Sequence, residues 1–189
     1  MRIYKADAMK GLAVAGLLLS MLMPFAPAQA RQWNPDGRAA ALDYTQIIHA
    51  KPAGEVVVVW WVVPETFVPA PNTQTMRDVL SRYVLIGIAD GKPGAGGMSF
   101  DNIADLKIMD QTARTLSPLP ANATPPDVAQ TTSTLQALAR QSLGGIGQGM
   151  HWFAFDGSTI HSCGAGKLSI PYGGETYAYD TPIPGCSKP

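Results

Sequence analysis

The chain has 189 residues with 14 basic and 14 acidic side chains, and 15% of its residues are charged, below the roughly 25% of an average soluble domain. The basic residues are too few and too scattered to form the clustered Lys/Arg face of a nucleic-acid-binding protein. We therefore expect no nucleic-acid partner and a surface built largely from uncharged polar residues, glycine and proline.

The first thirty residues have the pattern of a cleavable signal peptide. Arg2, Lys5 and Lys10 supply a positive start, residues 11–26 form an apolar stretch, and Ala28-Gln29-Ala30 offers small residues for a signal peptidase. An uncleaved membrane anchor is the alternative, but this apolar stretch is shorter than the roughly twenty residues that span a bilayer. We predict cleavage after Ala30.

Cleavage leaves residues 31–189 as a mature chain whose length suits a single β-rich domain. The removed segment takes three basic residues and one acidic residue with it, which leaves a formal charge of about −2. No later segment is long and apolar enough to cross a membrane. The sequence thus predicts a periplasmic or secreted protein of a Gram-negative bacterium, without stable membrane insertion after cleavage.

Two strongly apolar strands are predicted in the N-terminal half. Residues 55–63 include eight successive apolar residues without alternation, which is typical of a strand covered on both faces. A helical turn or two at 75–82 separates this strand from a second one at 83–89. Residues 90–97 are rich in glycine and are expected to form a flexible surface loop.

A short helix is predicted at 38–50, ahead of these strands. Its spacing would turn Ala41, Tyr44, Ile47 and Ile48 inward, and the proline and glycine that follow would end it.

The middle of the chain predicts one long helix after two short strands. The strands are expected at 103–109 and 115–119, with a turn at 110–114 between them. Thr124-Pro-Pro-Asp127 resembles a capping box, and Gly144-Gly145 can end the helix. Helical spacing predicts that one face packs on a sheet through Val128, Thr131, Leu135, Leu138, Ala139 and Leu143.

Two hairpins are predicted in the C-terminal third. A two-residue turn at Asp156-Gly157 would place Phe153, Phe155 and Ile160 in the core, with Trp152 and His161 together on the opposite face. A second turn at Gly173-Gly174 would pair three couples of residues across the ribbon: Ile170 with Tyr177, Leu168 with Tyr179, and Pro171 with Thr176.

The two cysteines of the chain, Cys163 and Cys186, both lie in the exported part. In an oxidising compartment a disulfide is expected, and it would tie the irregular C-terminal tail to a strand. A reactive thiol beside His161 is the alternative.

Histidines and cysteines also raise the possibility of a metal site. His151, His161 and Cys163 offer ligands that copper and zinc prefer, but they would share a face only with a three-residue loop in place of the Asp156-Gly157 turn. We expect no bound metal.

Catalytic and cofactor motifs are not recognisable. The glycines of 144–149 follow the predicted helix, whereas a dinucleotide loop must open one. Neither a G-x-S-x-G nucleophile motif nor an H-E-x-x-H metal motif occurs in the sequence. We expect no cofactor and, on balance, no enzymatic activity, with an envelope hydrolase of unidentified active site as the alternative.

Tryptophans are the best candidates for a binding surface. Trp60 and Trp61 are neighbours on one strand and must point to opposite faces, so one of them could line a groove. Trp152 and His161 are candidates on the outer face of the predicted hairpin. A neutral surface with an exposed ring suits contact with an envelope protein, a glycan or a small apolar ligand.

The predicted fold is mainly β, with sandwich-like antiparallel sheets and at least one packed helix; an α+β layered fold is the alternative. The function we expect is that of an exported binding or interaction module without catalytic activity.

Overall fold

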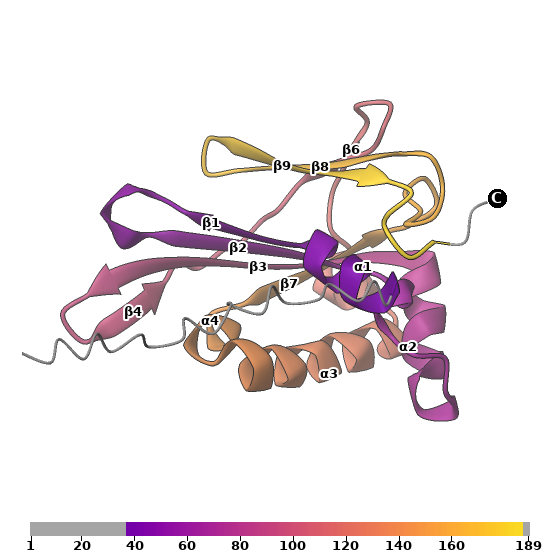
Figure 1. The fold of residues 1–189 in the computed structure, drawn as a ribbon, viewed down its shortest axis with the longest axis horizontal. Coiled ribbons are helices and arrows are strands. Elements are labelled where there is room, and N and C mark those ends of the chain that lie inside the picture. The colour runs from indigo at the N-terminus through magenta and orange to yellow at the C-terminus, as the bar shows by residue number, and fades with distance from the viewer. Residues whose placement is uncertain (1–36, 187–189) are drawn as a thin grey trace, which may run out of the picture. The chain divides into compact units, whose positions relative to one another are not determined.

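The computed structural model describes residues 37–186, which form two antiparallel sheets and a set of helices (Figure 1). The predicted signal peptide lies outside this part of the chain, and its cleavage stays a prediction. The first sheet contains β1 (Gln46–Ala50), β2 (Val56–Val62), β3 (Tyr83–Gly94), β4 (Gly97–Phe100) and β7 (His151–Asp156). The second sheet contains β5 (Ile108–Met109), β6 (Thr115–Leu116), β8 (Gly166–Tyr172) and β9 (Glu175–Thr181). The helices are α1 (Gly37–Thr45), α2 (Pro71–Arg82), α3 (Pro126–Leu143) and α4 (Gly145–Gln148), and the 3-10 turns are η1 (Pro52–Gly54), η2 (Pro64–Thr66) and η3 (Ala121–Ala123).

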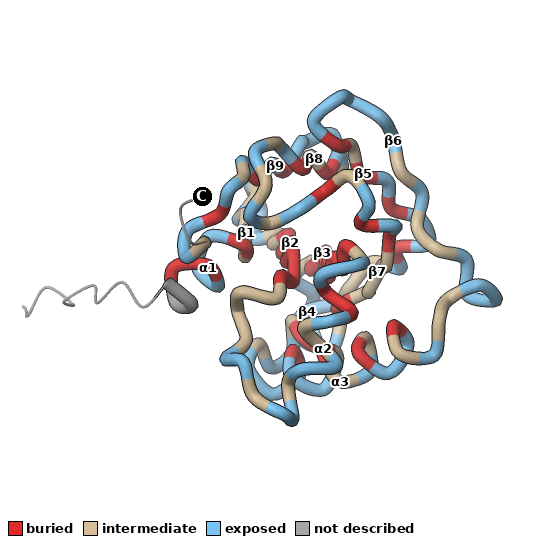
Figure 2. The backbone as a smooth tube through the Cα atoms, turned by 90° about the vertical axis from the view of Figure 1, so that its right-hand side faces the viewer, coloured by how far each residue is buried: buried red, intermediate tan, exposed pale blue. Residues whose placement is uncertain are grey.

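Three layers follow from this arrangement: the second sheet packs on one face of the first, and α2, α3 and α4 pack on the other (Figure 1). The predicted class, antiparallel sheets in a sandwich with at least one packed helix, is confirmed. The helices that cover the other face of the first sheet also agree with the alternative prediction, an α+β layered fold. Figure 2 shows the buried residues concentrated in the central strands β2 and β3.

β2 lies between β1 and β3 and is covered on both faces, as its unbroken apolar run predicts. Val57, Val59 and Trp61 join the core between the two sheets, while Trp60 and Val62 join the core under the helices. One strand therefore contributes to both cores, and a side chain on either face leaves water upon folding.

β3 extends to Gly94, so the prediction of a flexible loop at 90–97 is wrong. Its last residues pair with β4, with Gly91 opposite Phe100. A Cβ at Gly91 would lie 3.1 Å from side-chain atoms of Met98 and Phe100. Because Gly91 has no side chain, Met98 and Phe100 of β4 can pack closely against β3 at this position. The glycine-rich run therefore forms a hairpin of β3 and β4.

The second predicted hairpin is confirmed, residue by residue. β8 and β9 join at Gly173-Gly174, with Ile170 opposite Tyr177, Leu168 opposite Tyr179 and Pro171 opposite Thr176. Both glycines have positive φ, 59° and 81°, the conformation that a tight two-residue hairpin turn demands.

The first predicted hairpin, around Asp156-Gly157, is wrong. β7 ends at Asp156 and pairs with β3, far away in the sequence, with Gly87 opposite Trp152. The backbone N–H of Gly157 donates to the carbonyl of Arg82 at 3.0 Å, and a Cβ on Gly157 would lie 2.5 Å from that oxygen. The glycine is therefore required for a close approach to α2 and not for a turn between neighbouring strands.

The inward residues of this segment are nevertheless those expected. Phe155 and Ile160 lie in the core between the sheets, and Phe153 packs against it while partly exposed. The opposite face is different, because Trp152 packs under the helices whereas His161 lies in the irregular segment after Ile160, beside Cys163. The expected pairing of Trp152 with His161 does not form.

α3 packs on the first sheet through the predicted face, with Val128, Thr131, Leu135 and Ala139 buried. Leu138 is exposed and Leu143 is partly buried. The predicted capping box is wrong: the Thr124 hydroxyl donates to the carbonyl of Pro120 at 3.1 Å, and residue Pro125 precedes the helix without a side-chain cap. The hydroxyl thus bonds a local backbone carbonyl in place of the helix end.

The predicted helix at 38–50 is correct only in its first half. α1 ends at Thr45 and the chain continues as β1, whose β-branched residues favour a strand. Ala41 is buried as expected, but Tyr44 is 37% exposed and Ile48 is 62% exposed.

The predicted turn at 110–114 is confirmed and is organised by a buried carboxylate. Asp110 accepts hydrogen bonds from the backbone N–H and hydroxyl of Thr112, at 2.9 and 2.7 Å, and from the backbone N–H of Arg114 at 3.1 Å. These bonds, that from the Thr112 hydroxyl above all, lower the pKa of Asp110 to about 2. The ionised form is thus favoured in the folded protein.

This turn predicts a pH dependence of stability. Because the folded-state pKa of Asp110 is below its unfolded value of about 3.9, the stabilisation is complete above about pH 4 and is lost as the pH falls toward about 2. Asp110→Asn should therefore reduce the loss of urea resistance between pH 5 and pH 2.5, measured by circular dichroism. Exposed Asp105→Asn is the control and should leave that loss unchanged; equal acid sensitivity in the wild type and the Asp110 variant would contradict the assignment.

Candidate functional site

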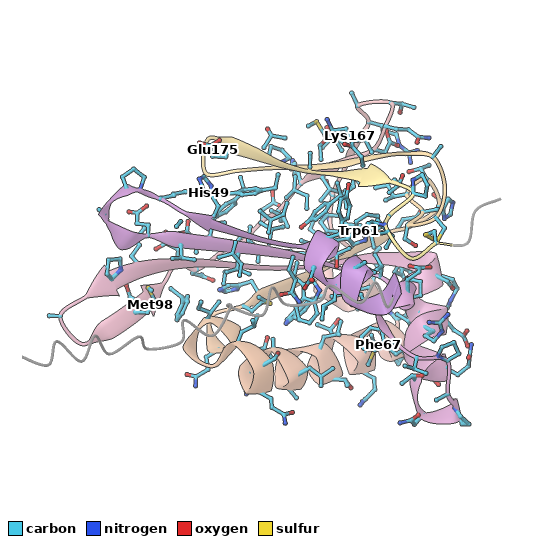
Figure 3. All side chains as sticks on the ribbon, viewed as in Figure 1. His49, Trp61, Phe67, Met98, Lys167 and Glu175 are labelled. Atoms are coloured by element: carbon cyan, nitrogen blue, oxygen red, sulfur yellow. A yellow bond between two sulfur atoms is a disulfide. The ribbon has the colours of Figure 1, made fainter. Side chains whose placement is uncertain are left out.

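Two of the candidate tryptophans lie inside the protein. Trp60 is 6% exposed under the helices, and Trp61 is 2% exposed between the sheets, where Figure 3 labels it. The rings point to opposite faces of β2, as the sequence predicts, but each face carries a core. Neither ring is open to a partner, so of the predicted binding residues only Trp152 and His161 reach the surface.

Trp152 lines an open groove of about 560 Å³. One wall is β7, at Trp152, Phe153 and Ala154, and another is α3. The outer wall is the segment 118–121, which we call the proline strap. The complete lining is Ala104, Pro118, Leu119, Pro120, Ala121, Thr124, Ala129, Thr132, Trp152, Phe153 and Ala154.

The Trp152 indole is fixed in the groove by contacts on several sides. Its Nε1–H donates to Oε1 of Gln136 at 2.8 Å, and Nε2 of the same amide donates to the carbonyl of Gly147 at 2.9 Å. The Trp60 ring lies against it, with centroids 5.7 Å apart. Beneath it, a Cβ on Gly87 would lie 2.8 Å from the indole, so the absence of a side chain there lets the ring lie across β3.

The outer edge of β7 leaves backbone groups facing the groove. The backbone N–H of Gly157 points toward β3. Because the hydrogen-bonding direction alternates along an antiparallel strand, the backbone N–H and C=O of Phe153 also point toward β3, whereas those of Trp152 and Ala154 point outward. The proline strap meets this edge once, where the Leu119 N–H donates to the Ala154 carbonyl at 2.7 Å. Within residues 37–186, the backbone N–H and C=O of Trp152 have no hydrogen-bond partner.

The groove is electrically neutral. None of its described lining residues carries a charge, and its hydroxyls are those of Thr124 and Thr132. Both donate to nearby backbone carbonyls, Thr124 to Pro120 at 3.1 Å and Thr132 to Val128 at 2.9 Å. Such a lining favours apolar contact and a few neutral hydrogen bonds, and it disfavours a charged group, which would lose its hydration there.

A cluster of polar side chains lies between the sheets near the β8–β9 turn. Asp90 is 7% exposed; its Oδ2 accepts from the Tyr172 hydroxyl at 3.0 Å, while Oδ1 is buried without a partner among the described residues. His49, labelled in Figure 3, lies close by, with Nδ1 3.2 Å from the Tyr177 hydroxyl. Burial and the Asp90 carboxylate raise the pKa of Tyr172. This cluster fastens one sheet to the other.

Cys163 and Cys186 are joined, with their sulfur atoms 1.95 Å apart. Glu65 approaches the bridge, with Oε1 3.4 Å from the Cys163 sulfur, and a small cavity of about 150 Å³ beside it is lined by His161. With both sulfur atoms in the bridge, neither cysteine carries a free thiol in the folded protein. The geometry therefore favours the disulfide over the reactive thiol.

Sequence reasoning identified Trp152 but missed the rest of the groove. The proline strap and the outward face of α3 come from residues that look like an ordinary loop and a solvated helix face. One signal was present: residues 115–126 form an uncharged run with four prolines, and such a run gives a stiff segment able to stand away from a sheet edge.

No helix among the described residues combines the length and the apolar character that crossing a membrane requires. Comparison of the chain with protein-family models, with curated proteins and with solved structures finds no match.

Proposed function

We propose that this protein is an exported binding module whose groove beside Trp152 takes an uncharged, largely apolar partner. The observation that carries the proposal is the neutral cavity of about 560 Å³ with a rigidly held indole in its wall. Ligand sites in proteins are mostly apolar clefts of about 300–1,000 Å³ with a few placed polar groups, and this groove has that size and chemistry.

The compartment we propose is the periplasm or the exterior of a Gram-negative cell. Support comes from the signal-peptide pattern of residues 1–30 and from the joined cysteines, since disulfides persist in oxidising compartments.

The binding role does not include catalysis. The two hydroxyls in the described lining donate to backbone carbonyls, and the lining places no carboxylate or imidazole beside them that could act as a base. Turnover of an envelope substrate by the purified protein, abolished by changing one polar residue, would overturn this part in favour of the hydrolase.

Filling the groove with a charge tests the proposal. Ala129 lies on α3 within the lining, and Ala137 is exposed on the same helix outside it. Ala129→Arg should weaken binding of the uncharged dye Nile red about tenfold or more, because the long cationic side chain occupies the groove and makes it polar. Ala137→Arg adds the same charge to the same helix and should leave the affinity unchanged.

Dye fluorescence titrations of both variants and the wild type decide the matter. Equal affinities in all three proteins, or no dye binding by the wild type, would contradict the proposed role of the groove.

A further inference from the structure

We infer that the occupant of the groove is an extended, uncharged segment of another envelope protein, which adds as a strand to the open edge of β7 opposite Trp152. This inference rests on the proposed function of the groove and specifies the class of partner. A polypeptide is favoured over a small apolar molecule because of what the groove wall contains.

The wall contains an unpaired strand edge as well as apolar side chains. The backbone N–H and C=O of Trp152 point outward and have no partner within the described residues. In an antiparallel pair, the N–H of one residue donates to the C=O of the residue opposite it, and its C=O accepts from the N–H of that same residue. An extended peptide can satisfy both groups at once, and this is how peptides recognise exposed sheet edges.

At one position on the edge of β9, Asp180, a side chain takes the place of a neighbouring strand. There the Tyr44 hydroxyl donates to the carbonyl of Asp180 at 2.9 Å and accepts from the backbone N–H of the same residue at 3.0 Å. The corresponding pair of groups on Trp152 has no such side chain. Proteins generally block edges that must not pair, so the open position beside a groove indicates a place for a strand.

The proline strap shows that this edge accepts an extended segment. The hydrogen bond from the Leu119 N–H to the Ala154 carbonyl is of the kind that joins two neighbouring strands. Among the described residues, the strap forms no such bond with Trp152. The strap thus fixes one end of the docking position, and the residues of an incoming strand would follow it along β7 toward His151.

The lining determines which segments fit. Side chains alternate across a strand, so one set of the partner's side chains would lie against Trp152 and α3, and the next against Phe153 and the proline strap. Both sides are uncharged, so a segment with small apolar or neutral polar residues is accommodated and a charged one loses hydration.

The test uses the mature protein and a capped peptide of alternating valine and threonine, about six residues long, which at about 3.3 Å per residue covers the open edge from His151 to Phe153 and extends beyond it. We expect it to bind the wild type and to bind Ala129→Arg about tenfold more weakly. The same peptide with every central amide N-methylated keeps its side chains but has no central backbone N–H donors, and it should lose its affinity.

Amide hydrogen exchange followed by NMR supplies a readout specific to strand pairing. The Trp152 amide should become protected when the peptide binds, whereas the Phe153 amide, already paired with β3, should change little.

The outcomes separate the two proposals. If the N-methylated peptide binds as well as the parent, or the Trp152 amide stays unprotected, strand addition is wrong and a binding groove remains. If Nile red binds but the peptide does not, the partner class is wrong. If neither binds, the proposed function fails with it.

Discussion

Replacing Phe155 with alanine is expected to lower the free energy of unfolding by about 3–5 kcal/mol. Its ring is completely buried in the core between the two sheets. It stands on β7 opposite Val84 of β3, and both residues belong to this core. Truncation would leave a cavity that two hydrogen-bonded sheets cannot close by moving together, so the loss should lie in the upper part of the range for large-to-small substitutions.

Phe153→Ala on the same strand is the matched control. Its ring points to the same face of the first sheet but is partly exposed and borders the groove. We expect a loss of less than about 2 kcal/mol, because less apolar surface leaves water at this position. Urea unfolding of the two variants gives both values, and a larger loss for Phe153→Ala than for Phe155→Ala would contradict the observed burial.

Elements whose causes are local could be predicted from the sequence. The run from Val56 to Val62 carries its own evidence of burial on both faces, because successive apolar residues must point both ways. Gly173-Gly174 fixes both the turn and the register of β8 and β9, since the two strands are adjacent in the chain and only glycine readily adopts the backbone that the turn requires.

Elements whose causes are distant could not be predicted. Asp156-Gly157 has the composition of a hairpin turn, but β7 finds its partner in β3, about seventy residues earlier in the chain. The decisive contacts are the approach of Gly157 to Arg82 and the packing of Trp152 over Gly87. Neither contact leaves a periodic signal in the sequence. The sequence shows where the glycines are, but it does not show which distant groups pack closely against them.

The candidate site is non-local in the same sense. The sequence singled out three tryptophans as large rings with uncertain surroundings, and their surroundings depend on which layers cover the first sheet. A helical layer over Trp60 and a second sheet over Trp61 bury these two rings. Trp152 remains partly open because β7 is an edge strand and the proline strap stands away from it after a single hydrogen bond. Topology therefore decides which tryptophan can meet a partner.

Removing the disulfide should have the next largest effect on stability. With a sequence separation of 23 between Cys163 and Cys186, the loop-entropy relation gives a contribution of about 3 kcal/mol, because the bridge restricts the unfolded chain. The double variant Cys163→Ser/Cys186→Ser should therefore unfold at lower urea concentration than the wild type. Mass measurement after alkylation without reduction checks the bridge itself, and two alkylated thiols in native protein would contradict it.

The native fold should nevertheless survive without the bridge, because other contacts hold the C-terminal segment. Ile183 is 2% exposed in the core between the sheets, and its backbone N–H donates to the carbonyl of Ser162 at 2.9 Å. The groove beside Trp152 is lined by none of these residues. We therefore expect the double variant to bind Nile red with wild-type affinity under conditions in which it is folded. Lost affinity in the folded variant would mean that the bridge acts on the groove as well as on the unfolded chain, and no contact among the described residues provides that coupling.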